Sequence, residues 1–287
     1  MKCTWRWVAT TMLVASSVLA GSAQAEEGWY AGVDLLFLSP KLNAVGFNNI
    51  FYDGSPANQT ADGQLSAPLE FSQRVIVGYE GEQGGGVQVR WFTFDNTTSY
   101  AGNGEDSVNG TIAIAGNLNF DVDSIDAEFT QRGSFNVWDW LATAGVRYAR
   151  VDIHEDASDK FEWAGFGDAV WFGLAGATFE GAGPTFSVQG SRPVIWDGLS
   201  VYGRARTALL FGDIDLDTIY LSNGGPLNIS DVFAQVWEFQ AGVKMVREFD
   251  AFDLVGGIFW EAQRWENDAS IGEFALHGFG VQTGIEY

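Results

Sequence analysis

Apolar and polar side chains alternate at every second position through most of this chain. The clearest case is segment 74–95, where two alternating runs, 75–79 and 87–91, flank the glycine-rich sequence EGEQGGG. Glycine tolerates positive φ, so this sequence can turn tightly. The segment therefore predicts a β-hairpin with one apolar face and one face that carries charge.

The same alternation recurs along the chain and predicts an all-β fold, because apolar residues do not return at helical spacing and no later stretch approaches 18 apolar residues. Long polar stretches at 39–68, 96–117, 154–173 and 217–230 alternate with short turns. The simplest count is ten strands with both termini at the short-turn end. Twelve are possible if 112–115 or 169–175 form additional strands. Pro184 lacks an amide donor and predicts a bulge or a weak point in its strand.

The N-terminus has the three parts of a secretory signal peptide. Lys2 and Arg6 precede an apolar run at 8–19, and Ala23-Gln24-Ala25 forms a small-residue cleavage site. The alternative, a membrane-anchoring helix, is disfavoured because the run is too short for a hydrocarbon core of about 30 Å. We expect residues 1–25 to be removed together with Cys3, the only cysteine. Residues 26–287 then form one β domain without disulfides.

The pattern of turns favours a transmembrane antiparallel up-and-down β-barrel of the outer membrane over a secreted β-sandwich. Outer-membrane barrels have short periplasmic turns and long external loops, and a closed barrel pairs every backbone group within the lipid. Amphipathic aromatic rings fit the headgroup zone of outer-membrane lipid. The predicted aromatic girdle comprises Trp29, Trp138, Trp140, Trp196 and Tyr287 at the short-turn end and Trp265 at the other end.

The chain ends on an aromatic residue that closes an alternating apolar series. This ending resembles the C-terminal signal that the barrel assembly machinery reads. Its residues are Phe279, Val281, Thr283, Ile285 and Tyr287.

A set of charged residues shares the polar face of the strands. Charges that face lipid at mid-membrane would cost about 2–4 kcal/mol each, so we expect these residues to point into the lumen. They could form opposed walls of an aqueous pore or ion pairs that plug the barrel. Because diameter scales with strand number, ten strands favour a narrow channel or partly plugged pore for ions or small solutes over a wide porin. The predicted lumen residues are Arg74, Glu80, Arg90, Asp126, Glu128, Arg147, Arg204, Arg206, Glu238, Lys244 and Glu261.

Five segments resemble those of the Legionella-type pore-forming outer-membrane proteins, also called major-outer-membrane-protein-like. They are GWYAGVDLLFLSP (28–40), RVIVGYEGEQGGGVQVRWFTFD (74–95), DSIDAEFTQR (123–132), LATAGVRYARVD (141–152) and FEGAGPTFSVQGSRPV (179–194). The resemblance spans most of the mature chain, and its motifs are structural. It implies a barrel and a pore, and it supplies no catalytic residue.

The net charge and the absence of known catalytic motifs exclude several classes of function. The net charge of −22 becomes −24 without Lys2 and Arg6, which argues against nucleic acid as a partner. It indicates a solvated acidic surface or, alternatively, acidic loops that bind divalent cations. Catalytic and cofactor motifs are absent from the sequence, so we expect no enzyme and no cofactor, and two histidines exclude a multi-histidine metal site.

Two alternatives to the pore remain from the sequence. One is a closed structural or adhesive barrel that acts through its acidic external loops. The less favoured one is a lipid hydrolase with a Ser-His pair, because His277 shares the apolar face of Phe279. An interfacial histidine close to the external loop end is the favoured explanation of His277, because no serine motif supports the enzyme.

Overall fold

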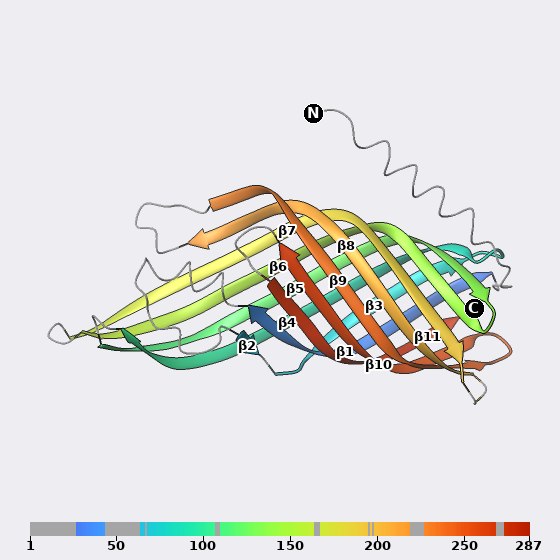
Figure 1. Cartoon of the computed structure of the whole chain (residues 1–287), viewed down its shortest axis with the longest axis horizontal. Helices are drawn as coiled ribbons and strands as arrows, with labels where there is room; N and C mark the ends of the chain where they lie inside the picture. Colours follow the sequence, from blue (N-terminus) through green and yellow to red (C-terminus); the bar gives the residue numbers. More distant parts are fainter. Residues whose placement is uncertain are drawn as a thin grey trace, which may run out of the picture.

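The computed structural model describes residues 27–43, 64–66, 68–106, 110–163, 167–194, 196, 198–218, 227–267 and 273–287. The predicted signal peptide and most of segment 39–68 lie outside these residues. The described chain is one antiparallel sheet (Figure 1). Its strands are β1 (Gly28–Asn43), β2 (Gln64–Ser66), β3 (Glu70–Glu80), β4 (Gly85–Asp106), β5 (Gly110–Phe135), β6 (Trp138–Trp163), β7 (Gly167–Pro193), β8 (Leu199–Thr218), β9 (Leu227–Glu248), β10 (Asp253–Asn267) and β11 (Glu273–Glu286).

The sheet closes because β11 pairs with β1 as well as with β10. Ten long strands form this closed barrel, and the short β2 only adds to the external end of β1. A row of paired residues that starts at Gly28 and crosses all ten strands returns to β1 at Pro40, twelve residues further along. This offset is the stagger that closure requires, and it explains the steep tilt of the strands in Figure 1.

The short turns lie at the end of the barrel that holds the C-terminus. Three of them contain a residue with positive φ: Gly84 (72°), Asn136 (58°) and Gly198 (77°). Glycine and asparagine tolerate this conformation best, so the sequence fixes these turns locally. The hairpin predicted at 74–95 is confirmed as β3 and β4.

Two predicted external loops were wrong. Segment 96–117 continues β4 to Asp106 and starts β5 at Gly110, and segment 154–173 likewise extends β6 and β7. Residues 112–115 and 169–175 therefore lengthen β5 and β7 and add no strands. Polar composition suggested loops here, but the extended hydrogen-bonded ladder lets polar side chains occupy strands. Figure 1 shows β4 to β7 reaching well beyond their neighbours.

Pro184 marks a gap in the ladder without a bulge. The pairing of β7 with β8 omits Gly183 and Pro184, yet its register is the same on both sides. The bulge lies instead between β8 and β9, at Gly212/Ile214. The missing proline amide explains the gap.

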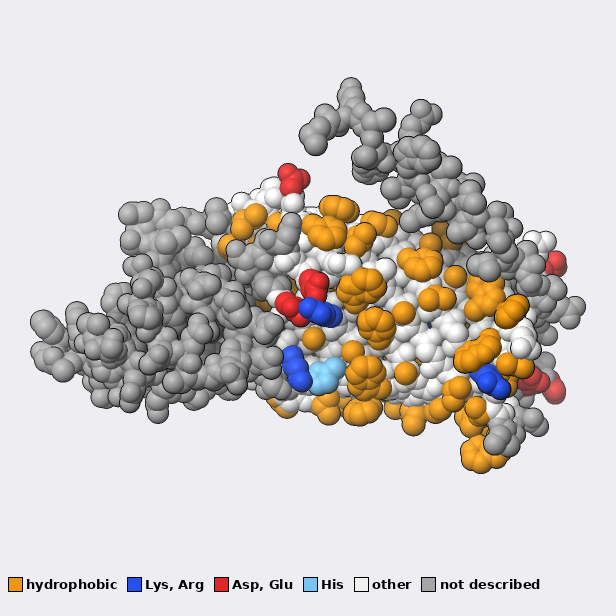
Figure 2. Space-filling model, in the orientation of Figure 1, with side chains coloured by type: hydrophobic (Ala, Val, Ile, Leu, Met, Phe, Trp, Pro, Cys, Tyr) orange, Lys and Arg blue, Asp and Glu red, His pale blue; other side chains and the backbone are white. Residues whose placement is uncertain are grey.

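The outer surface carries a band of apolar side chains (Figure 2). These residues alternate with buried ones along each strand, as expected for a wall between lipid and lumen. Trp29, Trp138, Trp196 and Tyr287 are exposed near the short-turn end, and Trp140 is partly buried. Trp265 does not belong to the outer girdle, because it is only 3% exposed and shares the inward side of β10 with Glu261 and Gln263.

Candidate functional site

A layer of charged side chains fills the middle of the barrel. Arg90 on β4 and Glu238 on β9 contact each other across the lumen, with 2.7 Å between Nη2 and Oε2. Arg147 on β6 binds the other oxygen of Glu238, also at 2.7 Å. Both arginines also bind Asp126 on β5, at 2.9 and 2.5 Å. Four strands are thus joined through two carboxylates.

A second cross-lumen pair lies beside this group. Arg74 on β3 binds Glu261 on β10 at 2.5 and 2.9 Å and Asp34 on β1 at 3.0 Å. The Glu261 carboxylate also accepts hydrogen bonds from Gln240 and Gln263. Neither Arg74 nor Glu261 is exposed to solvent. The sequence left two arrangements open, opposed walls of an aqueous pore or ion pairs within the lumen. These residues form ion pairs.

Arg206 and Arg204 complete the charged layer. Arg206 on β8 forms ion pairs with Glu128 and Asp126, and Glu128 also accepts hydrogen bonds from Gln88 and Thr143. Arg204 has no carboxylate within 4.0 Å among the described residues, and its guanidinium donates to the amide oxygen of Gln189. Five guanidinium groups therefore face five carboxylates, so the layer carries no formal net charge. Its members are Arg74, Arg90, Arg147, Arg204 and Arg206 with Asp34, Asp126, Glu128, Glu238 and Glu261.

The remaining two predicted lumen residues lie nearer the short-turn end. Glu80 on β3 accepts two hydrogen bonds from the Nε of Arg132 on β5, at 2.9 and 3.0 Å. Lys244 on β9 is half-buried and forms no ion pair with a described residue. The structure thus places Glu80 and Lys244 outside the central layer.

Sequence reasoning omitted Asp34 of the layer, Arg132 outside it and several neutral partners from its predicted set. Asp34 shares the inward side of β1 with Leu36, and Arg132 follows the inward pattern of Glu128 and Thr130. Strand parity could have identified both. The neutral partners Gln189, Gln240 and Gln263 carry no charge signal, so only the packed structure shows that they belong to the network.

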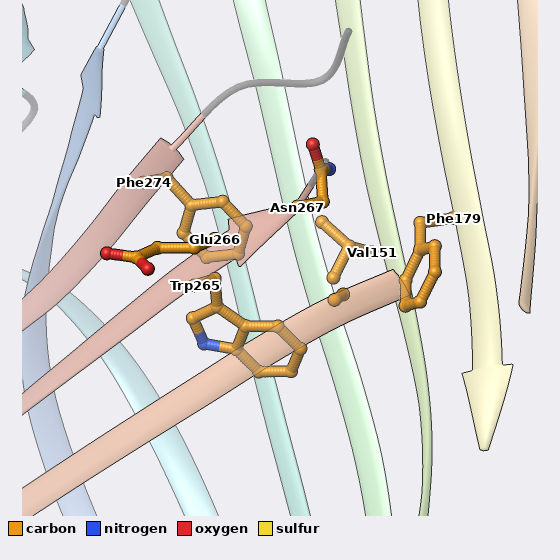
Figure 3. A pocket seen from close by; sticks show the side chains of 7 residues that line it. Val151, Phe179, Trp265, Glu266, Asn267 and Phe274 are labelled. Atoms are coloured by element: carbon orange, nitrogen blue, oxygen red, sulfur yellow. The ribbon is translucent and has the colours of Figure 1, made fainter. Parts of the chain in front are cut away.

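An apolar layer occupies the external half of the lumen. Phe120 on β5 contacts Phe274 on β11, with ring centroids 4.8 Å apart, and Phe274 stacks on Trp265 at 5.5 Å. Leu36 and Leu38 of β1 are fully buried in the same cluster. A cavity beside Trp265 and Phe274 holds only about 10 Å³, room for a single water (Figure 3). In this half of the barrel the buried inward side chains of the described residues are therefore mostly apolar, and none of the predicted charged lumen residues lies among them.

The hydrogen bond of His277 reaches a serine backbone and not the hydroxyl that a Ser-His pair needs. His277 lies on the outward side of β11, and its Nδ1 is 3.1 Å from the backbone carbonyl of Ser39. Among the described residues, no cluster of His, Cys, Asp or Glu could hold a metal ion.

A family model described as "Legionella pneumophila major outer membrane protein precursor" matches residues 22–257. The chain belongs to this family. Membership and the closed antiparallel barrel place the protein in the outer membrane. Among curated proteins, no match reaches significance.

Solved structures of outer-membrane proteins are similar to this family member. The outer-membrane protease OmpT from Escherichia coli matches with a TM-score of 0.52 and 9% identity over 91% of this chain and 96% of OmpT. The translocator domain of the autotransporter NalP from Neisseria meningitidis matches with 0.40 and 11% over 98% and 94% of the two chains. The toluene transporter TodX from P. putida gives 0.31 and 8% over 92% and 90%. At these identities OmpT supports the fold alone, and the two lower scores carry no argument about function.

Proposed function

We propose that this protein is a structural outer-membrane barrel with a lumen that is closed at rest, and that it acts through the strands that extend outside the membrane. The observation that carries the proposal is the pair of contacts across the lumen, Arg90–Glu238 and Arg74–Glu261. Water-filled pores keep their charged walls hydrated. Here the four arginines of the central ion pairs are at most 2% exposed.

The packing on either side of the charged layer supports the same proposal. Rings on opposite strands meet at Phe120 and Phe274 on the external side, so an ion would have to displace apolar side chains as well as break ion pairs. The charged layer is also neutral overall, which gives little reason for a counter-ion to enter. The proposal includes no enzymatic activity, because the similarity to OmpT concerns the fold only.

A narrow pore for ions or small solutes is the second candidate. Its support is the family resemblance together with the polar inward side chains between the charged layer and the short-turn end, such as Gln189 and Lys244. In this version the ion-pair layer is a gate that opens under some condition. Opening would have to separate Arg90 from Glu238 and also part the Phe120–Phe274 contact.

Planar-bilayer conductance of the purified barrel distinguishes the two candidates. We expect the wild type to show no steady conductance. We expect the double variant Glu238→Gln/Glu261→Gln, which removes the acidic partner of both cross-lumen pairs, to be less stable than the wild type and to show sporadic openings. Glu180→Gln is the matched control because Glu180 is exposed on the outer surface of β7, where it pairs with Arg150 at 3.6 Å and forms a hydrogen bond with Tyr148. Steady conductance of the wild type at ordinary potentials would overturn the closed barrel and support the pore.

A further inference from the structure

The outer surface of the barrel has an uneven charge distribution at its external boundary. Above the apolar band, β4 to β8 carry outward acidic residues, with Arg150 among them. The carboxylates are Asp95, Asp121, Asp123, Asp152, Glu180 and Asp213. The opposite side, formed by β10, β11 and β1, carries Arg264, His277 and Lys41, together with Glu266 and Glu273, which pair with Arg264. Figure 2 shows basic, acidic and histidine side chains gathered at the external edge of the orange band on one face.

The cations on this side differ in whether they already have partners. Arg264 is satisfied within the protein, because it binds Glu266 at 2.6 Å and Glu273 at 2.7 Å. Lys41 is exposed and has no carboxylate within 4.0 Å and no side-chain hydrogen bond among the described residues. His277 uses Nδ1 at the Ser39 carbonyl, and no described group hydrogen-bonds its Nε2. Lys41 Nζ is thus a donor without a partner among the described residues. Because Nδ1–H of His277 already donates to the Ser39 carbonyl, Nε2 becomes a second donor when the imidazole is protonated.

The strand register places these two side chains together. Ser39 pairs with His277 and Lys41 pairs with Ala275, so Lys41 has His277 and Glu273 as its diagonal neighbours on β11. The Glu273 carboxylate is already paired with Arg264. Diagonal side chains on one face of a sheet are within reach of a shared ligand when one of them is long. Lys and His⁺ are both suited to bind phosphate.

Their height on the barrel indicates what the ligand is. The row directly beneath them on the outer face is aromatic: Phe37 pairs with Phe279, which pairs with Trp260, and all three are exposed. Aromatic side chains mark the boundary between hydrocarbon and headgroups. A donor just above this row meets headgroups, and a lysine that faces lipid without a counter-charge is costly unless the lipid supplies one.

We propose that Lys41 and His277 form a binding site for the phosphate of an anionic lipid in the outer leaflet. The acidic residues on β4 to β8 would repel the same headgroup, so the site is confined to the β10–β11–β1 side. The inference does not depend on whether the lumen is closed. It assigns to one face of the barrel a preferred lipid neighbour.

Spin-labelled phosphatidic acid in phosphatidylcholine membranes that contain the folded barrel tests this site by electron paramagnetic resonance. We expect the motionally restricted fraction to be larger for phosphatidic acid than for spin-labelled phosphatidylcholine. Lys41→Gln should lower the relative association constant for phosphatidic acid roughly fivefold, which corresponds to about 1 kcal/mol for one lysine at a charged membrane surface. His277→Gln should lower it less, and Lys41→Arg should keep it.

Arg150→Gln is the matched control, because Arg150 is also exposed on the outer face but binds Asp152 and Glu180. It should leave the preference unchanged. The site is refuted if Lys41→Gln keeps the wild-type preference, or if Arg150→Gln lowers it equally. Loss of the preference on adding inorganic phosphate at a matched concentration would also overturn a lipid-specific site and indicate a general phosphate site. Heat modifiability on a gel confirms that each variant is folded.

Discussion

Arg90 on β4 and Glu238 on β9 face each other from opposite walls of the barrel and are joined by a 2.7 Å ion pair. The contact spans 148 residues of sequence. Glu238 also binds Arg147, and Asp126 binds the same two arginines, so the pair belongs to a group that ties four strands together. The barrel is therefore cross-braced through its centre as well as closed by its sheet.

Removal of Glu238 should destabilise the barrel strongly. Glu238→Ala leaves Arg90 and Arg147 buried with less counter-charge, and breaking a buried ion pair by removing one partner costs about 3–5 kcal/mol. Urea unfolding of the protein in lipid vesicles measures this loss. The exposed Glu180→Ala should change the free energy of unfolding by less than about 1 kcal/mol. Equal effects of the two substitutions would contradict a bracing role for the charged layer.

Exchange of the two charges should restore part of the lost stability. Arg90→Glu alone and Glu238→Arg alone each place like charges together, whereas the double variant recreates an ion pair of opposite orientation. We expect a favourable coupling free energy above about 1 kcal/mol in the double-mutant cycle. Asp126 and Arg147 will oppose full recovery, because each then lies beside a like charge. A coupling energy near zero would mean that the pair does not interact energetically.

The row of outward carboxylates above the aromatic band should make stability depend on pH. Burial, followed by the nearby Asp95 and Asp152 carboxylates, raises the pKa of Asp121 to about 6. An acid whose pKa is higher in the folded state binds protons on folding, so its contribution favours the folded state below about pH 4 and is lost as the pH rises through 6. Asp121→Asn should therefore raise the unfolding temperature at pH 8 and have no effect at pH 4.

The control for this prediction is Asp231→Asn on β9. Asp231 is exposed and has a φ of 62°, which asparagine tolerates. Its substitution should give the same small change at both pH values. A pH-independent effect of Asp121→Asn would contradict carboxylate repulsion as the cause.

Tyr287 should matter for assembly of the barrel. Its backbone amide donates to the Trp29 carbonyl at 2.9 Å, next to the seam between β11 and β1, while its side chain remains exposed. An exposed terminal aromatic ring contributes little packing, so any strong effect of its loss reports recognition. Tyr287→Lys should lower the folded fraction in cells, measured by heat modifiability of membrane fractions. Trp196→Lys, at another exposed turn residue, should lower it less, and equal losses would contradict a C-terminal signal read by the assembly machinery.

Trp265 and Trp260 should respond differently to quenchers in the lipid. Trp260 is exposed on the outer surface of β10, whereas Trp265 lies inside against Phe274. Replacement of Trp260 with Phe should reduce the fraction of tryptophan fluorescence that brominated lipids quench. Replacement of Trp265 should leave the quenched intensity unchanged. Quenching of Trp265 by brominated lipids would contradict its inward position and place it in the outer girdle.

The sequence by itself determined the strands, their turns and the two faces of each strand. Alternation at every second position is a local property, and glycine at positions such as Gly84 fixes turns through its own φ. For the same reason the sequence predicted that a set of arginines points inward, because each occupies the polar positions of an alternating strand. These are Arg74, Arg90, Arg147 and Arg206. The sequence did not determine how far β4 to β7 extend. Their external parts have the polar composition of loops, and the partner strands that pair with them cannot be recognised from the sequence alone.

Only the tertiary structure decided what the inward residues do to the lumen. Parity says that Arg90 and Glu238 point inward, but the distance between them depends on strand number and on the stagger that brings Gly28 into line with Pro40. That stagger is set by closure and makes opposite walls meet as ion pairs. Trp265 lies inside the external half against Phe274, its direct partner in the β10–β11 pairing, where the sequence had suggested a ring in the lipid boundary. A local pattern fixes which way a side chain points, and only the closed sheet fixes what it meets.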